Sequence, residues 1–239
     1  MSSAPLFSDR ADAGNQLAQV LLPLVNQEQE ARGVKLEPIV YALPRGGVPV
    51  AAAVADKLGC PLDIVVSKKI TMPRNPELAI GAVTSDGHAL WARPRRLDRK
   101  QSKLHQAALQ EAQAKAQAQL AQLSAALPKI RPEGALALLI DDGIATGMTM
   151  AAATKSLLAR TPAKVWICSP VAPLALSNWI SGWGDRTVIL EQPKLFSSVS
   201  RFYASFPQVA TEEAFLVLQE ANKKQQLLGN RQEGTGSKD

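Results

Sequence analysis

The segment LLIDDGIATGMTM, residues 138–150, decides how the rest of the chain is interpreted. Three branched apolar residues lead into two adjacent carboxylates, Asp141 and Asp142, and a turn of small residues follows. The alanine-rich segment after the turn predicts a helix from about Met148 to Ala159. This pattern is typical of a buried strand that ends at a binding loop and continues directly into a helix.

The turn between this strand and helix has the features of a phosphate-binding site. At a helix N-terminus several backbone N–H groups lack an acceptor within the helix, and the helix dipole adds positive potential. Thr146 and Thr149 can add hydroxyl donors, and Gly147 permits close approach of the backbone. An ordinary strand-to-helix turn also contains glycine, so the turn alone leaves both interpretations open. The chain has neither a GxxxxGK[ST] loop nor a GxGxxG fingerprint.

The acidic pair Asp141 and Asp142 precedes this turn and cannot hold a phosphate, because it carries the same charge. Carboxylates suit neighbouring hydroxyl groups, from which they accept hydrogen bonds, or a hydrated divalent cation. A phosphate site beside acceptors for a pair of hydroxyls describes a ribose 5-phosphate.

Predicted strands and helices alternate along the chain. Strands are predicted at 38–43, 62–70, 135–140, 164–172 and 186–193, with a hairpin at 79–92 that turns at Asp86-Gly87. Helices are predicted at 12–25, 48–59, 97–127, 148–159, 173–183 and 211–225. This order predicts an α/β fold with a mainly parallel central sheet flanked by helices. Because ligands bind beyond the carboxyl ends of such strands, the loops PRGG (44–47) and DDGIATGMT (141–149) are expected to share one crevice.

Composition and charge narrow the class of protein. No run of about 18 apolar residues occurs, and the N-terminus lacks a basic region followed by an apolar run, so we expect a cytoplasmic protein without a membrane partner. Cys60 and Cys168 are isolated and are predicted to be buried reduced thiols. The formal net charge of +6 favours anionic partners but does not choose between nucleic acid and a small phosphorylated metabolite.

Six basic residues fall within residues 91–103. They are Arg93, Arg95, Arg96, Arg99, Lys100 and Lys103. A solvated helix start explains such a run, and no aromatic residues interleave with it to stack bases. A nucleic-acid partner is therefore not favoured, although an RNA contact stays open.

These motifs resemble those of a known family. LLIDDGIATGMTM is similar to the signature segment of the type I phosphoribosyltransferases, which bind 5-phosphoribosyl 1-pyrophosphate (PRPP), and YALPRGGVPVA (41–51) resembles their pyrophosphate-binding loop. FSDRADAGNQLA (7–18), KKITMPRNPELAIGAV (68–83) and KLFSSVSRFYASFPQVATEEA (194–214) resemble a bacterial subgroup known mostly as predicted phosphoribosyltransferases. The resemblance implies a type I phosphoribosyltransferase-like fold with a small hood and, in this chain, an inserted long helix.

The resemblance also implies roles for individual residues. PRPP binding falls to Ala145, Thr146, Gly147, Met148 and Thr149 around the 5-phosphate, Asp141 and Asp142 at the ribose hydroxyls, and Pro44, Arg45, Gly46 and Gly47 at the pyrophosphate. The Pro44–Arg45 bond is expected to be cis. The cofactor implied is Mg²⁺, with Asp141 and Asp142 as candidate ligands through water. The segment TMPRNPEL (71–78) is a predicted loop and corresponds to a mobile lid, so Arg45, Lys68, Lys69 and Arg74 are the candidate catalytic cations.

The acceptor is identified less closely. Family members that use 6-oxopurines commonly have an acidic residue where this chain has Ala145, which argues against a 6-oxopurine acceptor. Phe196, Phe202 and Tyr203, together with Phe7, could stack on a planar acceptor or could belong to the core. His88 and His105 are expected at the surface.

A single phosphoribosyltransferase-like domain is predicted over residues 1–225. Within it, 88–133 is a hairpin strand and long-helix insertion, 193–225 is the hood with the C-terminal helix, and the tail 226–239 is predicted to be disordered. The insertion could form a cap, a dimer surface or a basic contact for another molecule, so a homodimer stays open.

Two functions from different classes follow. The first is a Mg²⁺-dependent phosphoribosyltransferase that takes PRPP and a small-molecule acceptor and releases pyrophosphate. The second is a non-catalytic regulator on the same fold that senses PRPP or a nucleotide, with RNA as a candidate partner. A lid with Lys68, Lys69 and Arg74 favours the enzyme, because a sensor does not need to shield chemistry from water. A phosphosugar hydrolase is a more distant alternative.

Overall fold

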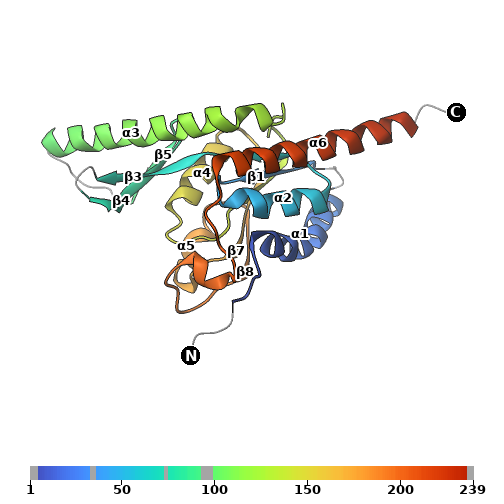
Figure 1. Cartoon of the computed structure of the whole chain (residues 1–239), viewed down its shortest axis with the longest axis horizontal. Coiled ribbons are helices and arrows are strands. Elements are labelled where there is room, and N and C mark those ends of the chain that lie inside the picture. Colours follow the sequence, from blue (N-terminus) through green and yellow to red (C-terminus); the bar gives the residue numbers. More distant parts are fainter. Residues whose placement is uncertain (1–4, 33–35, 73–74, 93–98, 236–239) are drawn as a thin grey trace.

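A five-stranded parallel sheet forms the centre of the computed structural model, which describes residues 5–32, 36–72, 75–92 and 99–235 (Figure 1). Its strands, in spatial order, are β2 (Leu62–Ile64), β1 (Pro38–Ala42), β6 (Leu136–Ile140), β7 (Lys164–Val171) and β8 (Arg186–Glu191). Every neighbouring pair in this sheet is parallel. The predicted α/β class with a mainly parallel sheet is confirmed.

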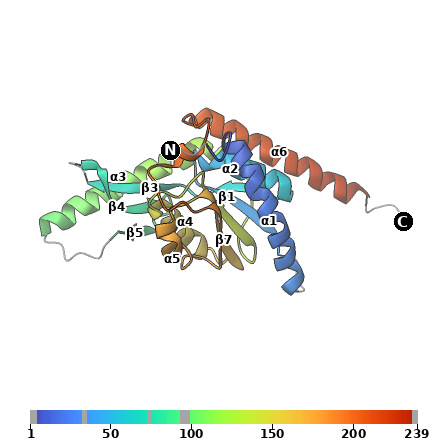
Figure 2. The same cartoon turned by 90° about the horizontal axis from the view of Figure 1, so that it is seen from below.

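Helices cover both faces of this sheet (Figures 1 and 2). Helices α1 (Arg10–Arg32), α2 (Gly47–Leu58) and α6 (Thr211–Thr235) pack on one face, and α4 (Met148–Leu158) and α5 (Ser177–Ile180) on the other. Strand β6 shows why: Leu138 belongs to the first core cluster and its neighbour Leu139 to the second, and all five residues of the strand are buried. A strand buried on both faces needs a continuous apolar run rather than an alternating one.

A second, antiparallel sheet of three strands projects from the body beneath the long helix (Figure 1). It consists of β3 (Ser67–Met72), β4 (Asn75–Thr84) and β5 (Ala89–Trp91). Two predictions are corrected here. The single strand predicted over 62–70 is divided at 65–66 between the two sheets, because an apolar run does not show which sheet it joins. The loop predicted over 71–78 is largely strand, because pairing of β3 with β4 overrides the local turn signals and a register shift absorbs the irregularity.

The inserted helix α3 (Arg99–Leu123) lies along this small sheet and is followed by a short 3-10 turn, Ser124–Ala126. Ala108 and Ala112 of α3 pack on Ile70 and Val83 of the sheet. On the opposite sheet face Ala82 packs against α4. The three strands are therefore held between α3 and α4, which confirms the predicted hairpin and long helix as elements.

The C-terminal helix α6 extends further than expected, to Thr235. The prediction of a disordered tail over 226–239 is wrong for residues 226–235, while 236–239 lie outside the described residues. No proline interrupts this stretch, and each residue added to an existing helix adds one hydrogen bond. Within the described ranges, no helix is long and apolar enough to cross a membrane.

The turn between β4 and β5 is fastened to α4 through Asp86. Its carboxylate accepts hydrogen bonds from Ser156 Oγ (2.7 Å), from an Arg160 guanidinium nitrogen (3.0 Å) and from Thr84 Oγ1. His88 Nδ1 lies 3.2 Å from the same carboxylate. Burial alone would raise the pKa of Asp86, but these hydrogen bonds outweigh it and lower that pKa. The small sheet is thus anchored at its turn while its opposite end projects.

Asp63 of β2 is expected to make the stability of the fold depend on pH. Burial raises the pKa of its carboxyl to about 6, and its Oδ1 accepts a hydrogen bond from the N–H of Ile64 (2.8 Å). Because the unfolded pKa is about 3.9, the folded state binds this proton more tightly, so stability falls as pH rises from about 4 to 6. We expect Asp63→Asn to raise the free energy of unfolding near pH 8 by up to about 3 kcal/mol and to change it much less near pH 4.

Urea denaturation of wild type and Asp63→Asn at the two pH values measures this difference. Asp56→Asn is a matched control, because the Asp56 carboxylate is half exposed and pairs with Lys224 at the surface. Equal stability of Asp63→Asn and wild type near pH 8 would contradict the expectation.

Candidate functional site

The loops PRGG and DDG meet at the carboxyl ends of β1 and β6, as predicted. The Leu43 N–H donates to the Ile140 carbonyl oxygen (2.8 Å), which joins the two loops where the strands end. A Cβ atom on Gly47 would lie 2.9 Å from that carbonyl oxygen, and one on Gly46 would overlap the Asp142 carboxylate. Only glycine fits this close approach. The Pro44–Arg45 peptide bond is cis, which confirms the expectation.

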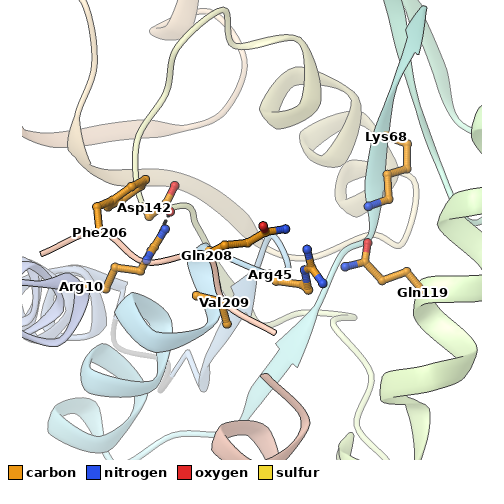
Figure 3. Close-up of a pocket in the computed structure, with 9 residues that line it drawn as sticks. Arg10, Arg45, Lys68, Gln119, Asp142, Phe206, Gln208 and Val209 are labelled. Carbon is orange, nitrogen blue, oxygen red and sulfur yellow. Dashed lines mark hydrogen bonds and ion pairs between the residues drawn. The ribbon is translucent and has the colours of Figure 1, made fainter. Parts of the chain in front are cut away.

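A cavity of about 480 Å³ opens beside these loops (Figure 3). Its lining consists of Arg10, Arg45, Gly46, Lys68, Gln119, Asp142, Phe206, Gln208 and Val209. These residues come from the start of α1, the PRGG loop, β3, α3, the signature loop and the hood segment (193–210). Four of them, Arg45, Gly46, Lys68 and Asp142, were predicted from sequence. Three cationic side chains and one carboxylate give the cavity an excess of positive charge, which suits an anionic ligand.

The turn predicted to bind phosphate, residues 145–149, has the geometry expected of a helix N-terminus. Gly147 caps α4 with a φ of 74°, a left-handed conformation that favours glycine. The Ala151 N–H donates to the Gly147 carbonyl (2.8 Å), so the N–H groups of the first turn of α4 have no acceptor within the helix. Ala145 and Thr146 are exposed and Thr149 is half-buried, so a ligand can reach all three. These N–H groups and hydroxyls are suited to a phosphate dianion.

Met148 differs from the other residues of this turn. Its side chain is buried against Ala82 of the small sheet, so only its backbone faces the turn. The turn 145–149 is not among the segments that line the cavity.

The two lysines predicted to be catalytic lie on opposite faces of the small sheet. Lys68 pairs with Val83, on the face covered by α3, and lines the cavity. Lys69 is exposed and pairs with Ala82, on the face covered by α4. Burial lowers the pKa of Lys68, and the positive charges of Arg45 and Lys115 lower it further. An anion between these groups would reverse the second effect.

Arg74, the fourth predicted cation, lies outside the described residues. Arg45 is held at the cavity by the hydrogen bond that its guanidinium donates to Thr211 Oγ1 (3.2 Å), at the start of α6.

A buried ion pair joins the signature segment to the N-terminal helix. Arg10 Nε donates to Asp142 Oδ2 (2.8 Å), and the exposed fractions of the two side chains are 9% and 14%. The same guanidinium donates to the Pro207 carbonyl (2.7 Å) and lies 3.7 Å from the ring centroid of Phe206. Tyr203 Oη donates to the backbone carbonyl of Asp142 (2.6 Å). Asp142 therefore ties three separate segments together.

The protonation of the acidic pair reflects this environment. Burial raises the pKa of Asp141 well above the usual carboxyl value, and the adjacent charge of Asp142 raises it further. Burial also raises the pKa of Asp142, but the Arg10 guanidinium opposes that rise. Asp141 Oδ1 accepts a hydrogen bond from the Asp142 N–H (2.9 Å). The Asp142 carboxylate is thus neutralised by Arg10, whereas no cation is paired with the Asp141 carboxylate among the described residues.

Of the predicted acceptor-stacking residues, Tyr203 is corrected by the structure. Its ring is only 4% exposed and packs 5.2 Å from that of Phe7 and 4.8 Å from that of Phe206. It therefore belongs to the interior of the hood and cannot stack on an acceptor in this conformation. Phe196 and Phe202 stack on each other at 5.4 Å and are half-buried, so their role stays a prediction.

Several cavity residues were missed by the sequence analysis: Arg10, Gln119, Phe206, Gln208 and Val209. Arg10, Phe206, Gln208 and Val209 lie within segments that carry the family resemblance. The sequence does not show which residues they contact, so no role was assigned to them. Two buried carboxylates in succession do require a nearby cation, and this requirement is the signal that could have found Arg10. Gln119 lies in α3, outside the segments that carry the family resemblance.

The acidic pair is also the candidate metal site. Among the described residues no group of three or more His, Cys, Asp or Glu side chains could hold a metal ion. Two carboxylates fit the way Mg²⁺ is commonly bound, through one or two carboxylates, several waters and the oxygens of a phosphorylated ligand. Asp141 and Asp142 would therefore hold such an ion only together with a substrate.

Comparison with known proteins agrees with this fold. The model of the phosphoribosyl transferase domain family matches residues 29–178, and the chain belongs to that family. A crystal structure of TT1426 from Thermus thermophilus superposes with a TM-score of 0.72 at 33% identity and covers 90% of this chain and 98% of that protein. The predicted family is confirmed.

Two Mycobacterium tuberculosis proteins, "Putative phosphoribosyl transferase MT0597" and "Putative phosphoribosyl transferase Rv0571c", are each 35% identical over 230 residues. The match covers 91% of this chain but only 47% of each relative. The chain thus spans about half the length of the curated relatives that it matches.

Proposed function

We propose that the protein transfers ribose 5-phosphate from PRPP to a small-molecule acceptor in a Mg²⁺-dependent reaction. The observation that carries this proposal is the convergence of Arg45, Lys68 and Asp142 on one cavity. The N-terminus of α4, which follows Asp142 along the same loop, supplies a second set of hydrogen-bond donors. The anions and hydroxyls of PRPP match these groups in kind: two phosphate positions need cations or N–H donors, and a ribose diol needs acceptors.

The 5-phosphate is assigned to the turn from Ala145 to Thr149. The unbonded N–H groups of the first turn of α4 would donate to its oxygens, with the hydroxyls of Thr146 and Thr149 as further donors. The ribose hydroxyls would donate to Asp141 and Asp142, which must then be ionised. Because Asp142 Oδ2 is occupied by Arg10, its second oxygen is the acceptor that a hydroxyl would use.

The pyrophosphate is assigned to the part of the cavity near Arg45, Gly46 and Lys68. In the reaction the bond between the anomeric carbon and a pyrophosphate oxygen breaks, and a bond to the acceptor forms on the opposite face of the sugar. The leaving group takes the electron pair of the broken bond, so negative charge develops on the pyrophosphate oxygen near Arg45 and Lys68. Mg²⁺ bound to pyrophosphate would neutralise part of that charge.

The acceptor is proposed to be a compound other than a 6-oxopurine, because Ala145 supplies no carboxylate at the base. Ala145 is exposed at the turn, so a side chain at this position can contact a ligand, and in this chain it carries no carboxylate. Phe196 and Phe202 of the hood remain the proposed aromatic contacts.

Calorimetric titration of the full chain with PRPP, with and without Mg²⁺, tests the proposal. We expect micromolar binding that requires Mg²⁺, followed by pyrophosphate release when the correct acceptor from a panel of bases and amines is added. Binding with no pyrophosphate release from any acceptor would favour the sensing regulator. Failure to bind PRPP under either condition would overturn both functions.

A further inference from the structure

The inserted helix α3 places one polar side chain where its amphipathic pattern calls for an apolar one. Ala112, Ala116 and Leu123 lie on one face of the helix, and all three are buried. Gln119 falls on the same face, three residues after Ala116 and four before Leu123. A polar residue that breaks the pattern of a buried face commonly marks a functional position.

Gln119 is buried without a complete set of hydrogen bonds. Its exposed fraction is 7%, and its Oε1 has no hydrogen-bond partner among the described residues. Leaving a buried polar atom unpaired costs about 1–3 kcal/mol, so a structure retains one only if something else compensates. Asn222 of α6 provides a contrast, because its amide group is buried to the same degree and bonds the Leu62 and Ala126 backbones.

Gln119 lines the cavity, although its unpaired Oε1 atom is itself buried. Figure 3 shows the Gln119 side chain pointing into the cavity near Arg45 and Lys68, all three of which line it. Both neighbours are cationic and donate hydrogen bonds without accepting any. The acceptor oxygens of an anion would therefore satisfy the two cations and the amide N–H groups of Gln119, whereas Gln119 Oε1 needs a donor. The amide N–H donors would bond the oxygens of the anion, and the amide oxygen would accept from a hydroxyl or from water around a bound cation.

We propose that Gln119 binds the pyrophosphate group of the substrate, so that the α3 insertion forms one wall of the substrate site. This inference rests on the function proposed above and extends it, because the insertion has no counterpart among the motifs that carry the family resemblance. The pyrophosphate end of the cavity is then built from three separate elements: the PRGG loop supplies Arg45, β3 supplies Lys68 and α3 supplies Gln119.

The test compares Gln119→Glu with a matched control on the same helix, Gln122→Glu. Gln122 is exposed three residues further along, so both variants add one negative charge to α3 at nearly the same place in the chain. Calorimetry on the full chain with Mg²⁺ measures binding of PRPP, inorganic pyrophosphate and ribose 5-phosphate. We expect Gln119→Glu to weaken binding of the first two by about tenfold or more through like-charge repulsion, and to leave ribose 5-phosphate binding within about twofold. Gln122→Glu should bind all three like wild type.

Gln119→Met covers the case in which the glutamate variant does not fold. Methionine has nearly the same shape and no polar atoms, so thermal denaturation without ligand should show a midpoint equal to or above that of wild type. Pyrophosphate binding should still weaken several-fold.

The different failures can be told apart. Wild-type PRPP and pyrophosphate affinities in both folded Gln119 variants would overturn this inference and leave the proposed function standing. Equal weakening for ribose 5-phosphate and pyrophosphate would also overturn it, because the effect would then be a general distortion of the site. No binding of PRPP by wild type would overturn the proposed function itself.

Discussion

Asp141→Asn is expected to bind PRPP about 10–100-fold more weakly than wild type, while folding at least as stably. A hydrogen bond from a ribose hydroxyl to an ionised carboxylate contributes about 1.5–3 kcal/mol, which corresponds to this range of affinity. Stability should move the other way, because burial and the adjacent Asp142 charge raise the pKa of Asp141 and so disfavour its ionised form. An asparagine keeps the Oδ1 acceptor for the Asp142 N–H and removes the charge.

Opposite signs of the two effects make the experiment diagnostic. Calorimetry with Mg²⁺ and PRPP gives the loss of affinity, and urea denaturation without ligand gives the stability. Asp142→Asn cannot serve this purpose, because it would strand the Arg10 charge in the interior. Asp56→Asn, which removes a surface carboxylate that pairs with Lys224 near the C-terminal end of α2, is the control and should change neither quantity. Unchanged PRPP affinity in a folded Asp141→Asn protein would remove this carboxylate from the site.

The elements around the signature could be predicted because their information is local. Strand β6 is a run of apolar residues buried on both faces, and α4 begins at Gly147 directly after the small-residue turn. Both signals are contained in 13 consecutive residues, 138–150. The meeting of PRGG with this turn also followed from a general property of parallel sheets, whose carboxyl ends share one edge.

Features that depend on distant segments could not be predicted in this way. The apolar run at 62–66 has the same sequence pattern whether the chain continues in one sheet or passes to another. Only the pairing of Ser67 with Thr84 shows that the chain has entered the second sheet. Lys68 and Lys69 are adjacent in sequence, yet the twofold repeat of a strand sends them to opposite faces. The sequence around Tyr203 does not show that its ring is buried. The ring is buried because a parallel bridge between Phe7 and Tyr203 holds the N-terminal segment against the hood.

Arg10 is the clearest case of a site residue hidden by sequence distance. It lies 132 residues from Asp142, its partner in the ion pair, and 197 from Pro207, whose carbonyl it also binds. Nothing local to FSDRADAG shows which of its charged residues turns inward. The same distance makes Arg10 structurally important, because its three contacts join the N-terminal helix, the signature and the hood.

Arg10→Met is accordingly expected to lower the free energy of unfolding by about 3–5 kcal/mol, the usual cost of removing one partner of a buried ion pair. Methionine preserves much of the side-chain length but cannot bond Asp142 Oδ2 or the Pro207 carbonyl. Urea denaturation near pH 8 measures the loss. Arg201→Met, the same substitution at an exposed arginine of the hood that bonds only Ser197 in the described structure, should change stability by less than about 0.5 kcal/mol.

The loss should shrink at low pH, and a second substitution should reverse much of it. The Arg10 cation lowers the pKa of Asp142, so its removal raises that pKa. In the folded variant Asp142 therefore keeps its proton to a higher pH than in wild type. Protonated Asp142 needs no partner charge, and the deficit of Arg10→Met near pH 5 should therefore be smaller than near pH 8. Arg10→Met/Asp142→Asn removes both charges and should recover most of the stability, because replacing a whole buried pair is often close to neutral. A double variant no more stable than Arg10→Met would place the stabilisation in the contacts with Phe206 and Pro207 instead of the ion pair.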